Sequence, residues 1–177
     1  MMAFTGILSQ GCSQIHSRLQ AMNRDNLALL NNKTGSTIRL QCIDVLSYSP
    51  DAGSLEAIDA SNEEGAKVAI KEILQQTGLL FKLNQTGMTW DENSISTFQI
   101  RLDQQIHNLE RCLSASSRSQ RMQITRLRVK RYFKKLRDLL EEKEYSQCAW
   151  EIVWIQVKQC FLQINRFIHS IPNEGME

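Results

Sequence analysis

The residue types best suited to chemistry in this sequence are five cysteines and three histidines: Cys12, Cys42, Cys112, Cys148, Cys160, His16, His107 and His169. No two cysteines have Cys-x-x-Cys spacing, and no histidine lies at a metal-ligand spacing from a cysteine, so we expect no zinc site. Cys160 has no recognisable histidine partner, and the sequence contains neither a glycine-rich phosphate loop nor a Gly-x-Ser-x-Gly motif. We therefore expect no catalytic residues, no metal and no cofactor, and interpret the protein as a binding protein.

Disulfide formation is the remaining chemistry open to the cysteines. Their number is odd, and sequence spacing alone does not choose among the possible pairings. Disulfides would indicate an oxidising compartment. Five free thiols would instead indicate an intracellular protein.

Composition favours one all-α domain. The chain has 177 residues, of which 42% are hydrophobic and 23% charged, and it has only two prolines and eight glycines, which argues against a turn-rich β-sandwich. No apolar run approaches the roughly 20 residues that span a bilayer, so we expect no membrane insertion. A net charge of +2 is too small to indicate a nucleic-acid partner by itself.

The N-terminal residues 1–11 are expected to be a leader remnant or a disordered segment. Ser9 and Gly11 lie three and one residues before Cys12, which fits the small-x-small rule for signal-peptide cleavage. An alternative translation start explains the segment equally well. Residues 12–177 are then a single helical domain.

Apolar residues recur at steps of three and four along five segments, at about residues 13–31, 61–81, 89–113, 120–144 and 147–170. This period predicts five helices. Ser61-x-x-Glu64 and Thr89-x-x-Glu92 are capping-box patterns that predict where the second and third helices begin. The strongest apolar stripe runs along the last segment, with Trp150 within it and Trp154 at its edge. Trp154 could be buried in the core or lie in an interface with a partner.

Connection lengths predict the topology. Only the first connection, about residues 32–60, is long enough to cross over the bundle, whereas the others are short and join antiparallel helices. We therefore expect an up-up-down-down four-helix bundle with one extra crossover helix and a long first loop.

Two surfaces could bind partners. The fourth helix holds nine Lys and Arg between Arg118 and Arg137 and no acidic residue, which would suit nucleic acid or heparin, although a solvated or receptor-facing surface is the simpler interpretation. Opposite the core stripe of the last helix lie Ile152, Ile155, Gln159 and Leu162. They would either contact a partner or be covered by a second layer of the bundle.

The amino-acid sequence of the last two helices resembles that of the type I interferons. The shared residues are Val129, Lys130, Arg131, Tyr132, Phe133, Leu140, Glu141, Lys143, Tyr145, Ser146, Cys148, Ala149, Trp150, Glu151, Ile152 and Val153. The third helix adds Thr89, Trp90, Asp91, Glu92, Phe98, Leu102, Gln105, Leu109, Glu110 and Cys112. The resemblance implies a secreted antiviral cytokine, a monomer that binds no nucleic acid. Such a protein brings together two different class II cytokine receptor chains and triggers JAK–STAT signalling and antiviral gene expression.

The resemblance also implies the disulfides Cys12–Cys112 and Cys42–Cys148, with Cys160 free. By motif alignment, it places contacts with one receptor chain on the first loop and the last helix, at Ile43, Leu46, Trp154, Ile155, Lys158 and Gln159. The basic pair Lys130 and Arg131 would face the other chain. Trp154, Lys158 and Gln159 replace the basic or methionine residues of mammalian members, and Leu46 replaces an arginine. The combination of these altered contact residues with a fifth cysteine is similar to non-mammalian members of the family, such as those of fish.

Two sequons, which begin at Asn32 and Asn84, fall in expected loops and are candidate glycosylation sites if the chain is secreted. Two other classes of protein remain open. One is another helical cytokine or hormone, which would not induce antiviral genes. The other is an intracellular helical adaptor or nucleic-acid-binding protein, which would have five free thiols.

Overall fold

The computed structural model describes residues 11–35, 38–47, 49–50, 55–58 and 61–173. Within these ranges the chain forms helices and no strands, which confirms the all-α prediction. The long helices are α2 (Ile15–Lys33), α4 (Glu63–Leu80), α5 (Glu92–Arg111), α6 (Gln120–Glu142) and α7 (Gln147–Ile168). The expectation for residues 1–11 falls almost wholly on residues outside the described ranges.

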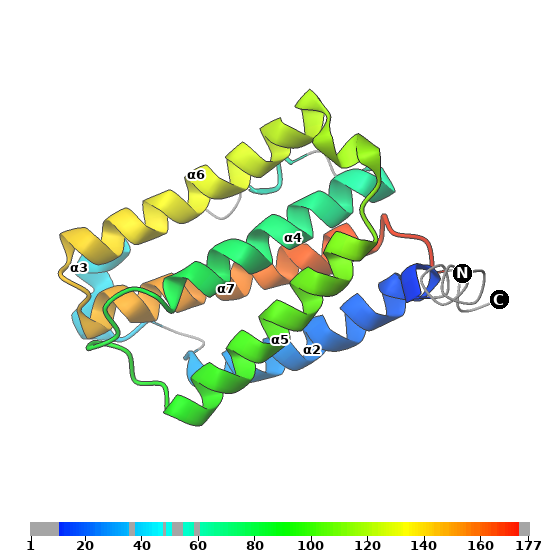
Figure 1. Ribbon diagram of the computed structural model, residues 1–177. Helices are drawn as coiled ribbons and strands as arrows, with labels where there is room; N and C mark the ends of the chain where they lie inside the picture. Colours follow the sequence, from blue (N-terminus) through cyan, green and yellow to red (C-terminus); the bar gives the residue numbers. More distant parts are fainter. Residues whose placement is uncertain (1–10, 36–37, 48, 51–54, 59–60, 174–177) are drawn as a thin grey trace.

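The helix directions follow the expected topology. In Figure 1, α2 and α4 run in one direction and α5 and α7 in the other, while α6 returns from the end of α5 to the start of α7. The arrangement is therefore an up-up-down-down bundle with one additional crossover helix. Among its described residues, the first connection carries the 3-10 helix η1 (Leu40–Cys42) and the short helix α3 (Ile43–Leu46), both of which contact α7. The 3-10 helix η3 (Ala115–Arg118) joins α5 to α6.

Two helices begin later than the capping-box patterns predicted. Asn62, not Ser61, caps α4, because its Oδ1 accepts a hydrogen bond from the Gly65 N–H at 2.6 Å. Asp91, not Thr89, caps α5 in the same way, with the Ser94 N–H 3.1 Å from Oδ2. Asn and Asp are at least as favourable as Ser and Thr at this position. The neighbouring Asx residue therefore takes the cap in both cases.

α7 lies at the centre of the core. Its buried residues occur on more than one side because it contacts α2, α4 and α6. Ile152 is fully buried, so the bundle covers this part of the second apolar stripe, whereas Leu162 remains 44% exposed. The second-layer interpretation is therefore confirmed for Ile152, whereas the partner contact stays a prediction for Leu162.

The connection between α4 and α5 lies against the turn that precedes α7. A Cβ at Gly87 would overlap the backbone carbonyl of Tyr145, so only glycine allows this approach. On the other side of the contact, Glu144 and Tyr145 have positive φ angles of 53° and 57°. This close packing brings Asn84 beside Trp150, whose indole N–H donates to the Asn84 carbonyl at 3.1 Å.

Candidate functional site

Two disulfides fix the ends of the bundle. Cys12–Cys112 joins the residues before α2 to the end of α5, and Cys42–Cys148 joins η1 to the first turn of α7. These are the pairs that the resemblance implied. They close loops with sequence separations of 100 and 106 residues, which in the chain-entropy model corresponds to about 4–5 kcal/mol each as an upper value.

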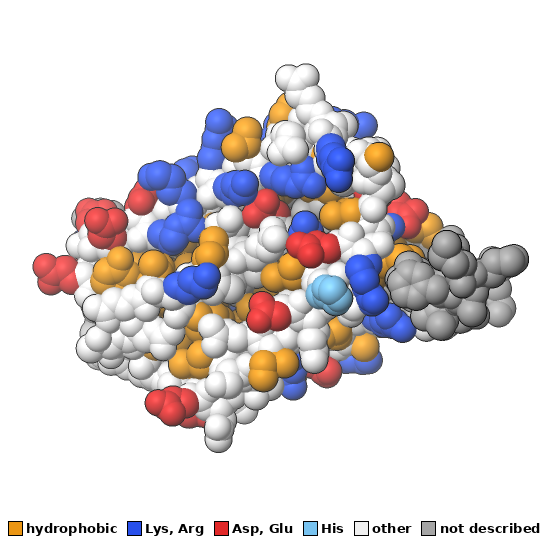
Figure 2. Space-filling view, in the orientation of Figure 1, with side chains coloured by type: hydrophobic (Ala, Val, Ile, Leu, Met, Phe, Trp, Pro, Cys, Tyr) orange, Lys and Arg blue, Asp and Glu red, His pale blue; other side chains and the backbone are white. Residues whose placement is uncertain are grey.

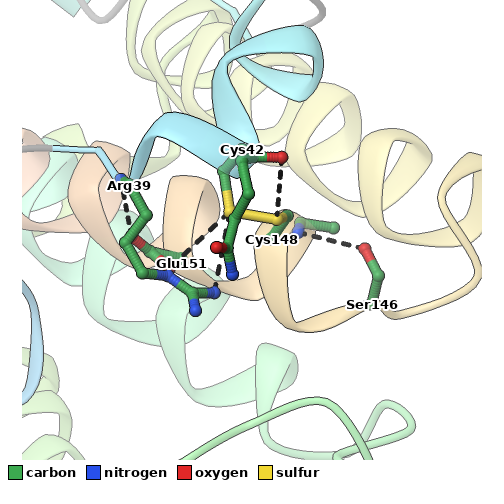
Figure 3. Close-up of polar contacts among 7 residues, drawn as sticks. Arg39, Cys42, Ser146, Cys148 and Glu151 are labelled. Atoms are coloured by element: carbon green, nitrogen blue, oxygen red, sulfur yellow. Dashed lines mark hydrogen bonds and ion pairs between the residues drawn. A yellow bond between two sulfur atoms is a disulfide. The ribbon is translucent and has the colours of Figure 1, made fainter.

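An ion pair next to Cys42–Cys148 strengthens the attachment of the first connection to α7 (Figure 3). The Arg39 Nε lies 2.7 Å from the Glu151 Oε2, and the Arg39 backbone N–H donates to Oε1 at 3.3 Å. Glu151 is 17% exposed, which shields this pair from solvent more than an ordinary surface pair. At the start of the same helix, Ser146 caps α7 by accepting from the Ala149 N–H at 3.2 Å.

Exposed and half-buried side chains lie on the first connection and on the outward side of α7. We call this the α3–α7 surface; its members are Leu40, Ile43, Leu46, Ile155, Lys158, Gln159 and Leu162. Leu40 is 86% exposed, Ile43 49% and Leu46 38%, whereas Ile155 and Lys158 are half-buried. Large apolar side chains concentrated on so short a segment are typical of a protein-binding surface.

Trp154 does not belong to this surface. Its side chain is 2% exposed, and its ring lies 4.4 Å from the ring of Trp90 and 5.2 Å from that of Phe81, measured between centroids. It also stacks on Trp150 at 6.0 Å. The structure therefore corrects the expectation that Trp154 contacts a receptor: the residue is part of an aromatic cluster beneath the surface.

A second candidate surface lies between α4, α5 and α6. An open groove of about 620 Å³ is lined by residues of all three helices, among them Leu79, Asp103 and Lys130. Lys130 is 51% exposed, and its Nζ lies 4.0 Å from the Glu72 Oε1. Arg131, the other member of the expected basic pair, is exposed. We call this groove with Lys130 and Arg131 the α4–α6 surface.

The two sequons differ in their surroundings. Asn32 is exposed but lies in the last turn of α2, not in a loop as predicted, because α2 continues to Lys33. Asn84 lies in the α4–α5 connection, also exposed, and its Oδ1 accepts hydrogen bonds from the Thr86 N–H at 2.9 Å and the Thr86 hydroxyl at 2.6 Å. Both asparagines are exposed, but Thr34 of the first sequon is buried and its hydroxyl donates to the Leu30 carbonyl at 2.6 Å.

The remaining candidates for chemistry lie apart from both surfaces. Cys160 is a free, fully buried cysteine, and burial raises the pKa of its thiol well above the usual range, an effect that the Tyr132 hydroxyl opposes only in part. Among the described residues there is no group of three or more metal-ligating side chains. None of the described helices is long and apolar enough to cross a membrane.

An up-up-down-down bundle with long crossover connections is typical of helical cytokines. A family model for the interferon alpha/beta domain matches residues 15–171. The chain is 36% identical to interferon alpha-2 of Equus caballus, over 86% of this chain and 84% of the relative. It is 31% identical to interferon tau of Cervus elaphus, over 94% and 87%, and 30% identical to interferon epsilon of Sus scrofa, over 91% and 85%.

The chain therefore belongs to the type I interferon family, whose members are secreted antiviral cytokines and not enzymes. Family membership favours this reading over an unrelated helical hormone or an intracellular adaptor. It also agrees with the two disulfides, which an intracellular protein with five free thiols would lack.

Two features of the α3–α7 surface carry no sequence motif. No recognisable motif contains Leu40, although its position two residues before Cys42 places it on the attached segment. The pairing of Arg39 with Glu151 is the second feature. Opposite charges three residues before Cys42 and three residues after Cys148 are the signal that could have indicated it, once the disulfide was assumed.

Proposed function

We propose that this protein is a secreted antiviral cytokine that bridges two different class II cytokine receptor chains at the cell surface. Bridging activates kinases bound to the cytoplasmic tails of the receptors, and JAK–STAT signalling then induces antiviral genes. Residues 12–177 act as one domain, and the protein binds as a monomer. The signal depends on the geometry of the complex and requires no chemistry by the cytokine.

The observation that carries this proposal is the rigid attachment of the α3–α7 surface. Leu40, Ile43 and Leu46 are exposed on a segment that Cys42–Cys148 and the Arg39–Glu151 pair attach to α7. A surface fixed before binding loses less conformational entropy on forming a complex. Large apolar side chains at its centre supply the desolvated contacts that dominate binding free energy. We assign this surface to the first receptor chain, with Ile155, Lys158 and Gln159 on its α7 side.

The α4–α6 surface is assigned to the second chain. It is formed by a different set of helices, so one monomer has room for both receptor chains. It contains the exposed charges of Lys130, Arg131 and Asp103 above the buried Glu72, and so differs from the apolar α3–α7 surface. Two chemically different surfaces suit two different receptor chains. Glycans at Asn32 and Asn84 are part of the same proposal, because both amides are exposed.

Binding to isolated receptor ectodomains tests the assignment. We expect the variant Ile43→Ser/Leu46→Ser to bind the first chain at least about tenfold more weakly, because each truncated contact at the centre of an interface contributes on the order of 1 kcal/mol. Its affinity for the second chain should stay unchanged. The ectodomains should come from the animal that supplies the sequence, and surface plasmon resonance gives both constants.

Ile100→Ser is the matched control. Ile100 is 57% exposed on α5, so the variant replaces an exposed isoleucine by serine outside the α3–α7 surface. It should leave the affinity for the first chain within about twofold, as expected for a residue outside the contact. Equal losses from the control and the test variant would contradict the assignment of the α3–α7 surface.

A further inference from the structure

The outer side of α6 carries a concentrated positive charge that the receptor proposal uses only in part. Nine of the 21 Lys and Arg residues lie between Arg118 and Arg137, where there is no acidic residue. The rest of the chain holds 12 basic and 19 acidic residues. Figure 2 shows Lys and Arg side chains gathered along α6 in this view. The small net charge of the protein therefore hides a strongly basic helix.

The basic side chains follow one side of the helix. Val129, Phe133 and Leu136 are fully buried against the core, so residues about half a turn away must point outward. Arg128, Arg131, Lys134 and Lys135 occupy these outward positions and are exposed. Steps of three and four residues place successive charges about 4.5–6 Å apart along the helix axis. The result is a linear array of positive groups.

Much of this charge has no internal partner. Lys134 pairs with Asp138 at 2.9 Å, and Arg128 donates to the Ala57 carbonyl at 2.8 Å. Within the described part of the chain, Arg131 and Lys135 have neither a hydrogen bond nor an ion pair. Lys130, one residue before Arg131, instead lines the groove beside Glu72. The outward array is therefore distinct from the groove, with Arg131 at the border between them.

We propose that the outward side of α6 binds a sulfated polysaccharide of the glycosaminoglycan class on cell surfaces. A regular row of ammonium and guanidinium groups matches a linear chain of sulfates. Guanidinium groups form paired hydrogen bonds with tetrahedral oxyanions of this kind. The occupant would hold the cytokine close to the membrane that carries its receptors. The extracellular location of this ligand rests on the proposed secreted function.

Two other anionic partners fit the structure less well. Membrane-surface helices need a wide exposed apolar face, whereas α6 buries its apolar face in the core and leaves only Ile124 and Leu127 substantially exposed. Single-stranded nucleic acids are bound by aromatic side chains that stack on bases. The two aromatic residues of α6, Tyr132 and Phe133, are buried at 2% and 0% exposure.

Heparin oligosaccharides test the proposal through the salt dependence of binding. We expect the variant Arg131→Gln/Lys135→Gln to lower the slope of log affinity against log salt by about two, since each lost ionic contact lowers it by about one. Glutamine keeps the helix propensity of these exposed positions. Isothermal titration at several salt concentrations, with the purified full chain, gives the slope.

Arg18→Gln/Arg24→Gln is the matched control, because it removes the same charge from exposed positions of α2. An unchanged slope for the control supports a defined site on α6. Equal changes in both variants would mean that only net charge matters and would overturn the proposal. Tighter binding of phosphatidylserine vesicles or of single-stranded DNA than of heparin would also overturn it.

The measurement uses no receptor, so its failure leaves the proposed signalling function standing. Loss of receptor binding by the wild-type protein, in turn, would leave the heparin result unaffected. The two proposals can therefore fail separately.

Discussion

Two tryptophans of α7 lie in the same aromatic cluster but differ in their polar contacts. Trp150 is 1% exposed, and its indole N–H donates to the Asn84 carbonyl at 3.1 Å. Trp154 is 2% exposed, and its indole N–H is buried with no hydrogen-bond partner. An unmade hydrogen bond in the interior costs about 1–3 kcal/mol. The two residues therefore contribute differently to stability despite similar burial.

We expect Trp150→Phe to destabilise the protein more than Trp154→Phe. Both changes remove similar ring volume, but the first leaves the Asn84 carbonyl without its donor, whereas the second removes a donor that has no acceptor. The difference in unfolding free energy should be about 1–3 kcal/mol. Urea unfolding followed by circular dichroism measures it, and a Trp154→Phe variant as unstable as Trp150→Phe would contradict the assignment.

At the scale of elements, Asp91 joins the end of α2 to the start of α5. Its Oδ1 lies 2.6 Å from the Lys33 Nζ, and the same carboxylate caps α5. The Lys33 ammonium and, to a lesser extent, Ser94 hold the pKa of the Asp91 carboxyl far below its usual range. Because the pKa is lowered in the folded state, the charged carboxylate stabilises the protein at pH values above the unfolded-state pKa of about 3.9. This stabilisation is lost progressively as the pH falls below that value.

We therefore expect Asp91→Asn to be less stable than the wild type at pH 7, with a difference that shrinks at pH 3. Asparagine keeps the capping acceptor, so the change isolates the charge. In a Lys33→Gln background the same substitution should have a smaller effect. Denaturant unfolding at both pH values tests this, and a pH-independent difference would show that the ion pair contributes nothing.

The two disulfides close loops of similar length but lie at different positions in the bundle. Removing either one, as Cys42→Ala/Cys148→Ala or Cys12→Ala/Cys112→Ala, should lower stability by a similar amount of about 2–5 kcal/mol, because the loops are of nearly equal length. Only loss of Cys42–Cys148 frees η1 and α3 from α7. Affinity for the first receptor chain should therefore fall more in that variant, under conditions where circular dichroism shows both to be folded. Equal affinities would contradict the role assigned to this bridge.

At the scale of the whole molecule, the sequence predicts the helices and their directions well. The stripe from Trp150 to Phe167 and the lengths of the connections depend on local periodicity and chain reach, which sequence contains directly. The burial of Trp154 could not be predicted in this way. It depends on Phe81, at the end of α4, and on Trp90, in the connection after it. A residue at the edge of a helical stripe faces the core or the solvent according to such neighbours.

The surfaces show the same division. Ile43, Leu46 and Lys130 could be selected through the family resemblance, and the structure leaves all three exposed. Leu40 and the Arg39–Glu151 pair become evident only when Cys42 is joined to Cys148. Long-range proximity, not residue type, is the information that a single sequence lacks.

The central claim is that one monomer bridges two receptor chains through two separate surfaces. STAT phosphorylation in responsive cells tests it with two variants, Ile43→Ser/Leu46→Ser on the α3–α7 surface and Lys130→Glu/Arg131→Glu on the α4–α6 surface. We expect each variant to lose signalling, their mixture to restore none of it, and the second variant in excess to block the wild-type protein by occupying the first chain. Full signalling by either variant alone, or recovery when they are mixed, would contradict the bridging account.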